Sequence, residues 1–180
     1  MFSKINVTDI LRDHLLTLLD VRNQQVSKSD VFLFFGSPLL VGAAGWYFHL
    51  KFNYDGLTTI LTAFSIFAGL LLNLLVVLLA FADRPDSAAS LLQVRRQLVR
   101  ELNTNISFAI LVSLCVVMVS LVAVFWLAGK PADQKIMSAP TTAILVALLA
   151  NFVLTLLMIL KRIYVVLDEA FRSRSLKKSA

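Results

Sequence analysis

The residues that most often carry out chemistry in proteins are scarce in this chain, and their spacing assembles no reactive set. There are two histidines and one cysteine, at His14, His49 and Cys115. A zinc site needs about four ligands, and proteolysis in a membrane needs a nucleophile with its base or a pair of acids. The neighbours Asp168 and Glu169 do not face each other on a helix. We therefore expect no enzyme, no catalytic residue, no metal and no cofactor.

The composition accounts for this scarcity. Hydrophobic residues make up 58% of the 180 residues, charged residues only 16%, and the mean hydropathy is +0.81. A soluble domain has about 25% charged residues, and so few polar side chains could not cover a small soluble fold. The sequence therefore excludes a disordered chain, a nucleic-acid-binding domain and a water-soluble enzyme. The net charge of +6 comes from basic residues beside apolar runs, so we expect anionic lipid headgroups as their counter-charge.

Four apolar segments are long enough to cross a bilayer, which takes about 20 helical residues. They are residues 31–50, 58–82, 106–128 and 141–160, and none contains Asp, Glu, Lys or Arg. Of the 17 Lys and Arg residues, 14 lie in residues 1–30, 83–105 and 161–180. The positive-inside rule places these segments in the cytoplasm. We predict an all-α integral membrane protein with four transmembrane helices and both termini cytoplasmic, in a bacterial inner membrane.

The cytoplasmic segments are predicted to be helical and half apolar. They comprise an amphipathic helix within 1–30, a second within 83–105, and a basic helical tail over 161–180. Such helices could lie in the headgroup layer or pack into a small cytoplasmic bundle. We favour the bundle, because no clear helix breaker separates the second and third segments from their spans.

The cytoplasmic segments also supply candidate binding residues. A soluble protein partner is expected to bind the second segment at Leu91, Val94, Leu98, Leu102, Arg95, Arg96 and Arg100. Lipid headgroups are expected to contact Arg172, Arg174, Lys177 and Lys178 in the tail, with Trp46 and Trp126 at the outer interface.

Polar residues inside the spans are the other candidates. Asn73 and Asn151 lie within leucine-rich helices, and Ser113 and Ser120 are seven residues apart in the third span. A carboxamide is costly in lipid, so each asparagine should face another helix, where a hydrogen bond contributes roughly 0.6–2 kcal/mol. The alternative is that these four side chains line an oligomeric pore.

The second and fourth spans suggest an internal duplication. LLLNLLVVLL at 70–79 aligns with LLANFVLTLL at 148–157, each with a Thr-Thr pair upstream and an Arg eleven residues after the Asn. A real duplication would relate the two halves by an axis along the membrane normal. Leucine-rich helices also match by chance, so both interpretations stand.

The sequence favours a homo-oligomeric, non-enzymatic membrane subunit. We expect an anchor or sensor that couples to a soluble cytoplasmic partner, because the cytoplasmic helices are elaborate and the outer loops are bare. The alternative is an oligomeric ion-conducting pore or membrane-perturbing effector. The general plan resembles the small four-span subunits of bacterial phage-defence systems, which pair a membrane protein with a soluble effector. That resemblance implies an antiviral role for the alternative; it is one of architecture alone.

Overall fold

The computed structural model describes residues 7–17, 32–82, 89–131 and 134–178, and side chains at 8–15, 32, 34–80, 99–131 and 134–165. This part of the chain is all-helical. Its helices are α1 (Val7–Thr17), the π-helix η1 (Phe32–Gly36), α3 (Ser37–Tyr47), α4 (Tyr54–Ala82), α5 (Ala89–Ala128) and α6 (Ala139–Lys178). Within these ranges, extended structure is limited to one antiparallel bridge between Asn53 and Ile136.

Three helices are long and apolar enough to cross a bilayer. The apolar stretches are Tyr54–Ala80 in α4, Val99–Ala128 in α5 and Ala139–Val165 in α6. The first predicted span, residues 31–50, forms a shorter helical run made of η1 and α3. That run ends at Tyr47 because His49 adopts a left-handed conformation with φ of 52°. The amides of His49 and Leu50 then close the helix on the carbonyls of Trp46 and Gly45, which is a Schellman cap.

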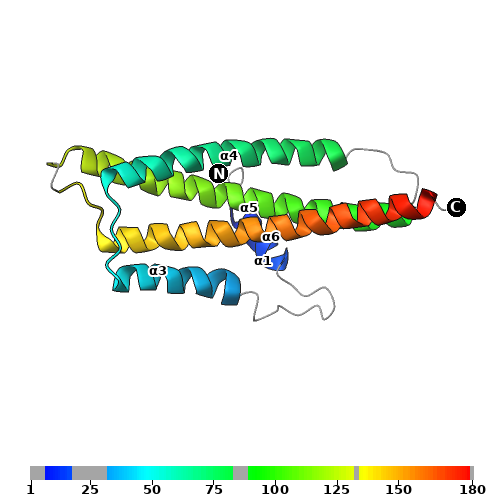
Figure 1. The fold of residues 1–180 in the computed structure, drawn as a ribbon, viewed down its shortest axis with the longest axis horizontal. Helices are drawn as coiled ribbons and strands as arrows, with labels where there is room; N and C mark the ends of the chain where they lie inside the picture. The colour runs from blue at the N-terminus through cyan, green and yellow to red at the C-terminus, as the bar shows by residue number, and fades with distance from the viewer. Residues whose placement is uncertain (1–6, 18–31, 83–88, 132–133, 179–180) are drawn as a thin grey trace.

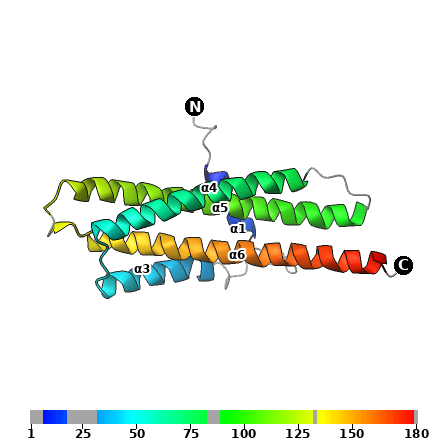
Figure 2. The same ribbon diagram turned by 45° about the horizontal axis from the view of Figure 1, so that its top comes forward.

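The helices lie side by side, with α5 packed between α4 and α6 (Figures 1 and 2). The short α3 packs on α6, whereas α1 crosses the long helices and contacts α5. At one end, called the loop end, lie the connecting residues 48–53, 129–131 and 134–138. There the Met137 amide donates to the Phe52 carbonyl at 2.9 Å. At the opposite end, α5 and α6 extend well beyond α3 (Figure 1).

The core follows a seven-residue repeat along α5. Its fully or nearly buried residues include Leu102, Ile106, Ala109, Ser113, Val116, Ser120, Ala123 and Leu127. This alternation of four- and three-residue steps is the seam of left-handed helix packing, which is common between membrane helices. On α6, Phe152 is buried and its ring lies 4.8 Å from that of Phe64 on α4. The core therefore joins all three long helices.

The outer surface of the helices is strongly apolar. Large exposed side chains include Leu70 on α4, Val122 on α5 and Leu157 on α6. In water such a surface would be an extensive apolar patch, whereas lipid chains solvate it without cost. The structure thus supports an integral membrane protein, as the composition predicted.

Candidate functional site

His14 is the most deeply enclosed polar side chain of α1. It is fully buried, and its Nδ1 lies 2.9 Å from the Oδ1 of Asn105 on α5. An amide oxygen only accepts, so Nδ1 is the donor. The imidazole stacks on Phe108, with ring centroids 3.8 Å apart and planes 9° apart. It also forms a T-shaped pair with the Phe34 ring of η1, with ring centroids 6.0 Å apart. His14 therefore fastens α1 to α5 and η1.

The surroundings of His14 keep its imidazole neutral. Burial lowers its pKa to about 4, since charging an enclosed ring is unfavourable, while the hydrogen bond to Asn105 raises the pKa and the positive Arg162 lowers it further. The burial effect outweighs the hydrogen bond. At neutral pH this histidine is therefore an uncharged donor, well suited to docking against aromatic rings.

An ion pair lies beside the histidine. The Arg162 Nη1 on α6 donates to the Glu101 Oε2 on α5 at 2.6 Å. Glu101 precedes Asn105 by one helical turn, so both acidic and amide groups project from the same side of α5. We call His14, Glu101, Asn105 and Arg162 the polar cluster. It joins α1, α5 and α6 near the end of the apolar stretch of α6.

The Asn151 side chain bonds a backbone carbonyl that Pro38 cannot reach with a donor of its own. Proline has no N–H, so Pro38 cannot donate to the carbonyl of Phe34 four residues earlier. The Asn151 Nδ2 on α6 donates to that carbonyl at 3.1 Å. In a membrane, such freed backbone groups have to be satisfied by a neighbouring helix. The Asn151 side chain therefore has a packing role at the join of η1 and α3.

The other predicted polar residues of the spans have different environments. Asn73 is exposed on α4. Ser113 is buried and donates to the Ile110 carbonyl at 2.7 Å, and Ser120 is buried on the same seam of α5. The structure of one chain thus places the two serines in the core, and the described hydrogen bonds of Ser113 and Asn151 go to backbone carbonyls.

The predicted partner-binding residues lie on α5. Leu102 is buried in the core, whereas Arg100 is exposed. The side chains of Leu91, Val94, Leu98, Arg95 and Arg96 lie outside the described part of the chain, although their backbone is helical. The partner-binding surface therefore stays a prediction, and Leu102 is positioned to pack within the chain.

Of the predicted headgroup contacts, the structure describes the side chains of the two tryptophans only. Trp46 and Trp126 are exposed at the loop end, where the Lys130 ammonium lies 5.6 Å from the Trp126 ring. The side chains of Arg172, Arg174, Lys177 and Lys178 lie outside the described residues. The two tryptophans thus mark one level of the helix bundle, as interfacial aromatic residues do.

Sequence reasoning missed the polar cluster. It considered His14 only as a metal ligand, a role it rejected, and it did not connect Asn105, Glu101 or Arg162 with this histidine. One signal was available. Glu101 and Asn105 are four residues apart, directly before an apolar span. That spacing indicates a polar patch at a membrane boundary, but it does not reveal the partner from α1.

The contacts of this site are suited to docking α1. A carboxamide and two aromatic rings among the described residues orient His14. Among the described residues, no three His, Cys, Asp or Glu side chains are grouped to hold a metal ion. Compared with protein-family models, curated proteins and solved structures, the chain matches none. The lengths and contacts of the chain's own helices are therefore the basis for inferring its function.

Proposed function

We propose that the chain is a four-span, homo-oligomeric membrane subunit without enzyme activity, which anchors or senses and couples to a soluble cytoplasmic partner. The observation that carries this proposal is the length of α5 and α6, which have 40 residues each. About 20 residues cross a bilayer, and the apolar stretches take up 30 residues of α5 and 27 of α6. The remaining 10 residues of α5 and 13 of α6 therefore extend beyond the bilayer. Because α5 and α6 are antiparallel neighbours, both extensions leave the membrane on the same side and can present a joint surface to a protein.

The fourth span of this proposal is the η1–α3 run. Its helical residues, 32–47, lie beside α6 with Gly42 at the closest approach. The run is shorter than the long helices, and the apolar residues Phe48 and Leu50 extend it toward the interface. With this run spanning, both termini are on the side of the α5 and α6 extensions. The positive-inside rule makes that side the cytoplasm.

The polar cluster offers a route for sensing. It holds α1 across the long helices and ties it to α5 at Asn105. The exposed Leu11 and Leu15 of α1 are available to lipid acyl chains. A change at the membrane surface that displaces α1 would release the side of α5 that carries Glu101 and Asn105. The projecting ends of α5 and α6 would then report that change to a partner.

Co-purification tests the partner. The tagged protein would be purified from its own host, and bound proteins would be identified by mass spectrometry. Replacing Leu91, Val94 and Leu98 with serine should abolish a reproducible soluble companion while membrane insertion is retained. A matched control replaces Gln93 and Gln97, which lie off that apolar stripe, with serine. An unchanged companion in the triple variant would contradict the proposed surface.

The second candidate is an oligomeric pore or membrane-perturbing effector, including the membrane component of a phage-defence system. The exposed Asn73 in the apolar part of α4 favours it, because a lipid-facing carboxamide is costly. Water in a pore would hydrate this carboxamide, whereas a partner subunit would hydrogen-bond it. Ion flux into liposomes, followed with a potential-sensitive dye, tests this candidate. Flux that Asn73→Leu changes while the oligomer persists would support the pore; silent liposomes would favour the anchor.

We also propose that the two halves of the chain arose by internal duplication. Thr59 donates to the Asp55 carbonyl and Thr142 to the Ser138 carbonyl, so the second threonine of each pair makes the same bond four residues back near the starts of α4 and α6. The two pairs lie at different distances from the aligned asparagines, their second threonines being 14 residues before Asn73 and 9 before Asn151. The two halves have since diverged, since Asn73 is exposed and Asn151 is bonded to Phe34.

A further inference from the structure

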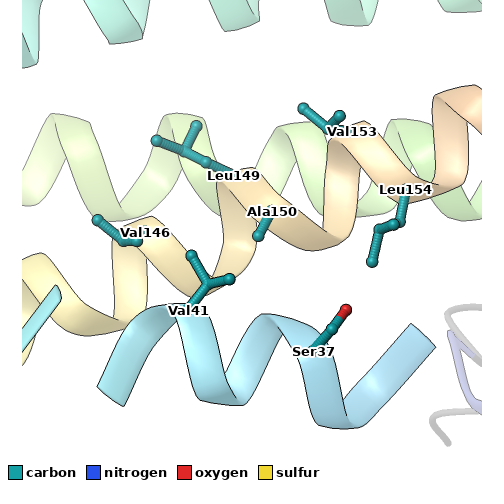
Figure 3. A pocket seen from close by; sticks show the side chains of 7 residues that line it. All are labelled: Ser37, Val41, Val146, Leu149, Ala150, Val153 and Leu154. Atoms are coloured by element: carbon teal, nitrogen blue, oxygen red, sulfur yellow. The ribbon is translucent and has the colours of Figure 1, made fainter. Parts of the chain in front are cut away.

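A groove runs between α3 and α6 on the outer surface of the helix bundle (Figure 3). It has a volume of about 430 Å³ and is lined by Ser37 and Val41 from α3 and by Val146, Leu149, Ala150, Val153 and Leu154 from α6. Ser37 is the single polar residue among these. Figure 3 shows its hydroxyl pointing toward α6.

The groove has close helix contact beside it and a basic residue beyond one end. In the middle of α3, a Cβ on Gly42 would lie 2.8 Å from the Ala143 carbonyl oxygen, so the two helices are in backbone contact there. Farther along α6, away from the loop end, Lys161 is exposed. Lys161 follows Leu154 by seven residues and so lies on the same stripe of α6, about 10 Å farther along. The apolar groove therefore leads toward the positively charged side chain of Lys161.

This arrangement fits a lipid better than another helix. A helix with side chains is about 10–12 Å wide, so 430 Å³ would hold at most about one of its turns. An acyl chain is thinner and can lie along the whole groove. The apolar walls match its hydrocarbon, and the positive Lys161 matches a phosphate at the level where the apolar stretch of α6 ends, near Val165.

We propose that the α3–α6 groove binds one acyl chain of an anionic phospholipid, whose phosphate contacts Lys161. The proposal needs α6 to lie in the membrane, but it does not depend on a soluble partner or on a pore. A lipid bound there would contact both helices beside their close approach at Gly42. It would therefore stabilise α3 against α6.

Native mass spectrometry of the full-length protein, released from nanodiscs, tests the proposal. The discs would contain equal amounts of dioleoyl phosphatidylglycerol and dioleoyl phosphatidylcholine. Ala150→Phe fills the groove, and Val122→Phe, on the exposed face of α5, is its matched control. Lys161→Gln removes the cation, and Lys51→Gln at the loop end is the matched control, since both lysines are exposed.

The wild-type protein should retain phosphatidylglycerol in preference to phosphatidylcholine. One basic residue near an anionic lipid contributes about fivefold in binding, so Lys161→Gln should reduce that preference by about this factor while Lys51→Gln does not. Ala150→Phe should remove one retained lipid of either kind. Retention equal to that of both controls would overturn the proposal. Loss of a dimer from Ala150→Phe, with lipid retention unchanged, would instead assign the groove to a second copy of the chain.

Discussion

Asn73 and Asn151 show how one residue type serves two surroundings in similar leucine-rich helices. The Asn151 carboxamide holds the Phe34 carbonyl that Pro38 leaves without a donor, whereas Asn73 is exposed. Replacing Asn151 with leucine should therefore lower the stability of the folded protein by about 0.6–2 kcal/mol. Thermal unfolding in detergent measures this loss. Asn73→Leu is the matched control and should leave the melting temperature of the monomer unchanged. Equal effects of both variants would contradict the role given to Asn151.

His14 makes the docking of α1 dependent on pH. Its pKa is lowered to about 4 by burial in the docked helix, against 6.5 for an exposed histidine. The undocked state therefore binds more protons between these values, and docking weakens as the pH falls through 6.5 toward 4. At pH 5 the loss is about 2 kcal/mol. The charged groups near the ring, Arg162 on α6 and Glu101 on α5, form a pair with each other.

Hydrogen exchange of the α1 amides, corrected for the intrinsic rates, measures that docking. Protection should be full above pH 6.5 and should fall as the pH approaches 5. In His14→Phe the ring can still stack on Phe108 but cannot be charged, so protection should no longer vary between pH 7 and pH 5. A variant that keeps the wild-type pH profile would show that another group is responsible.

These residues also show how far sequence reasoning reaches. A carboxamide within a span must find a partner, and Pro38 must free a carbonyl, so both halves of the Asn151 contact could be predicted separately. Their pairing could not, because 117 positions separate the two bonded residues. The contact between His14 and Asn105 spans 91 positions. No periodicity in a single sequence encodes contacts of that separation, which depend on how the helices are packed.

At the scale of elements, α3 is held by small residues. A Cβ at Gly42 would lie 2.8 Å from the Ala143 carbonyl oxygen and 3.0 Å from the Ala147 Cβ, so backbone would have to move. A Cβ at Gly45 would meet Leu50 and Val146 at 3.5 and 3.6 Å, which is ordinary contact. Gly42→Ala should separate α3 from α6 and destabilise the protein, by about 1–3 kcal/mol as for other overpacked sites.

Gly45→Ala is the matched control for that prediction. It adds a methyl group without a clash, in a helix where alanine is preferred to glycine by roughly 0.5–1 kcal/mol. The melting temperature should therefore rise slightly or stay the same. Unfolding curves of the two variants in the same detergent make the comparison. A stable Gly42→Ala together with a destabilised Gly45→Ala would mean that α3 packs differently on α6.

The elements differ in how well their boundaries could be predicted. The long helices were anticipated because apolar length is a strong signal. The continuity of α5 and α6 with the charged segments beside their apolar stretches follows from the lack of a breaker. The end of α3 was not anticipated. His49 carries the left-handed conformation of its cap, a position where glycine is the usual signal. At its other end, this run begins with the π-helix η1, just before Pro38. The position of Pro38 in the sequence does not determine which type of helix forms there.

At the scale of the whole molecule, the number of spans decides where the N-terminus lies. The loop end joins α3 to α4 and α5 to α6, so α4 and α6 run away from it and α3 and α5 run toward it. If the η1–α3 run crosses the bilayer, residues before it lie on the same side as the C-terminus. If only α4, α5 and α6 cross, the N-terminus lies on the opposite side. The two termini therefore report the topology directly.

Cysteine labelling shows on which side of the membrane each terminus lies. In a Cys115→Ser background, single cysteines would replace Ser3, Ser138 or Ser179, and intact cells would be treated with a membrane-impermeant maleimide. Four spans with cytoplasmic termini predict labelling at position 138, at the loop end, and at neither terminus until the membrane is opened. Labelling at positions 3 and 138 alone would mean that α3 does not span. Labelling at positions 3 and 179 but not 138 would reverse the orientation, and the α5 and α6 extensions would then face a partner outside the cytoplasm.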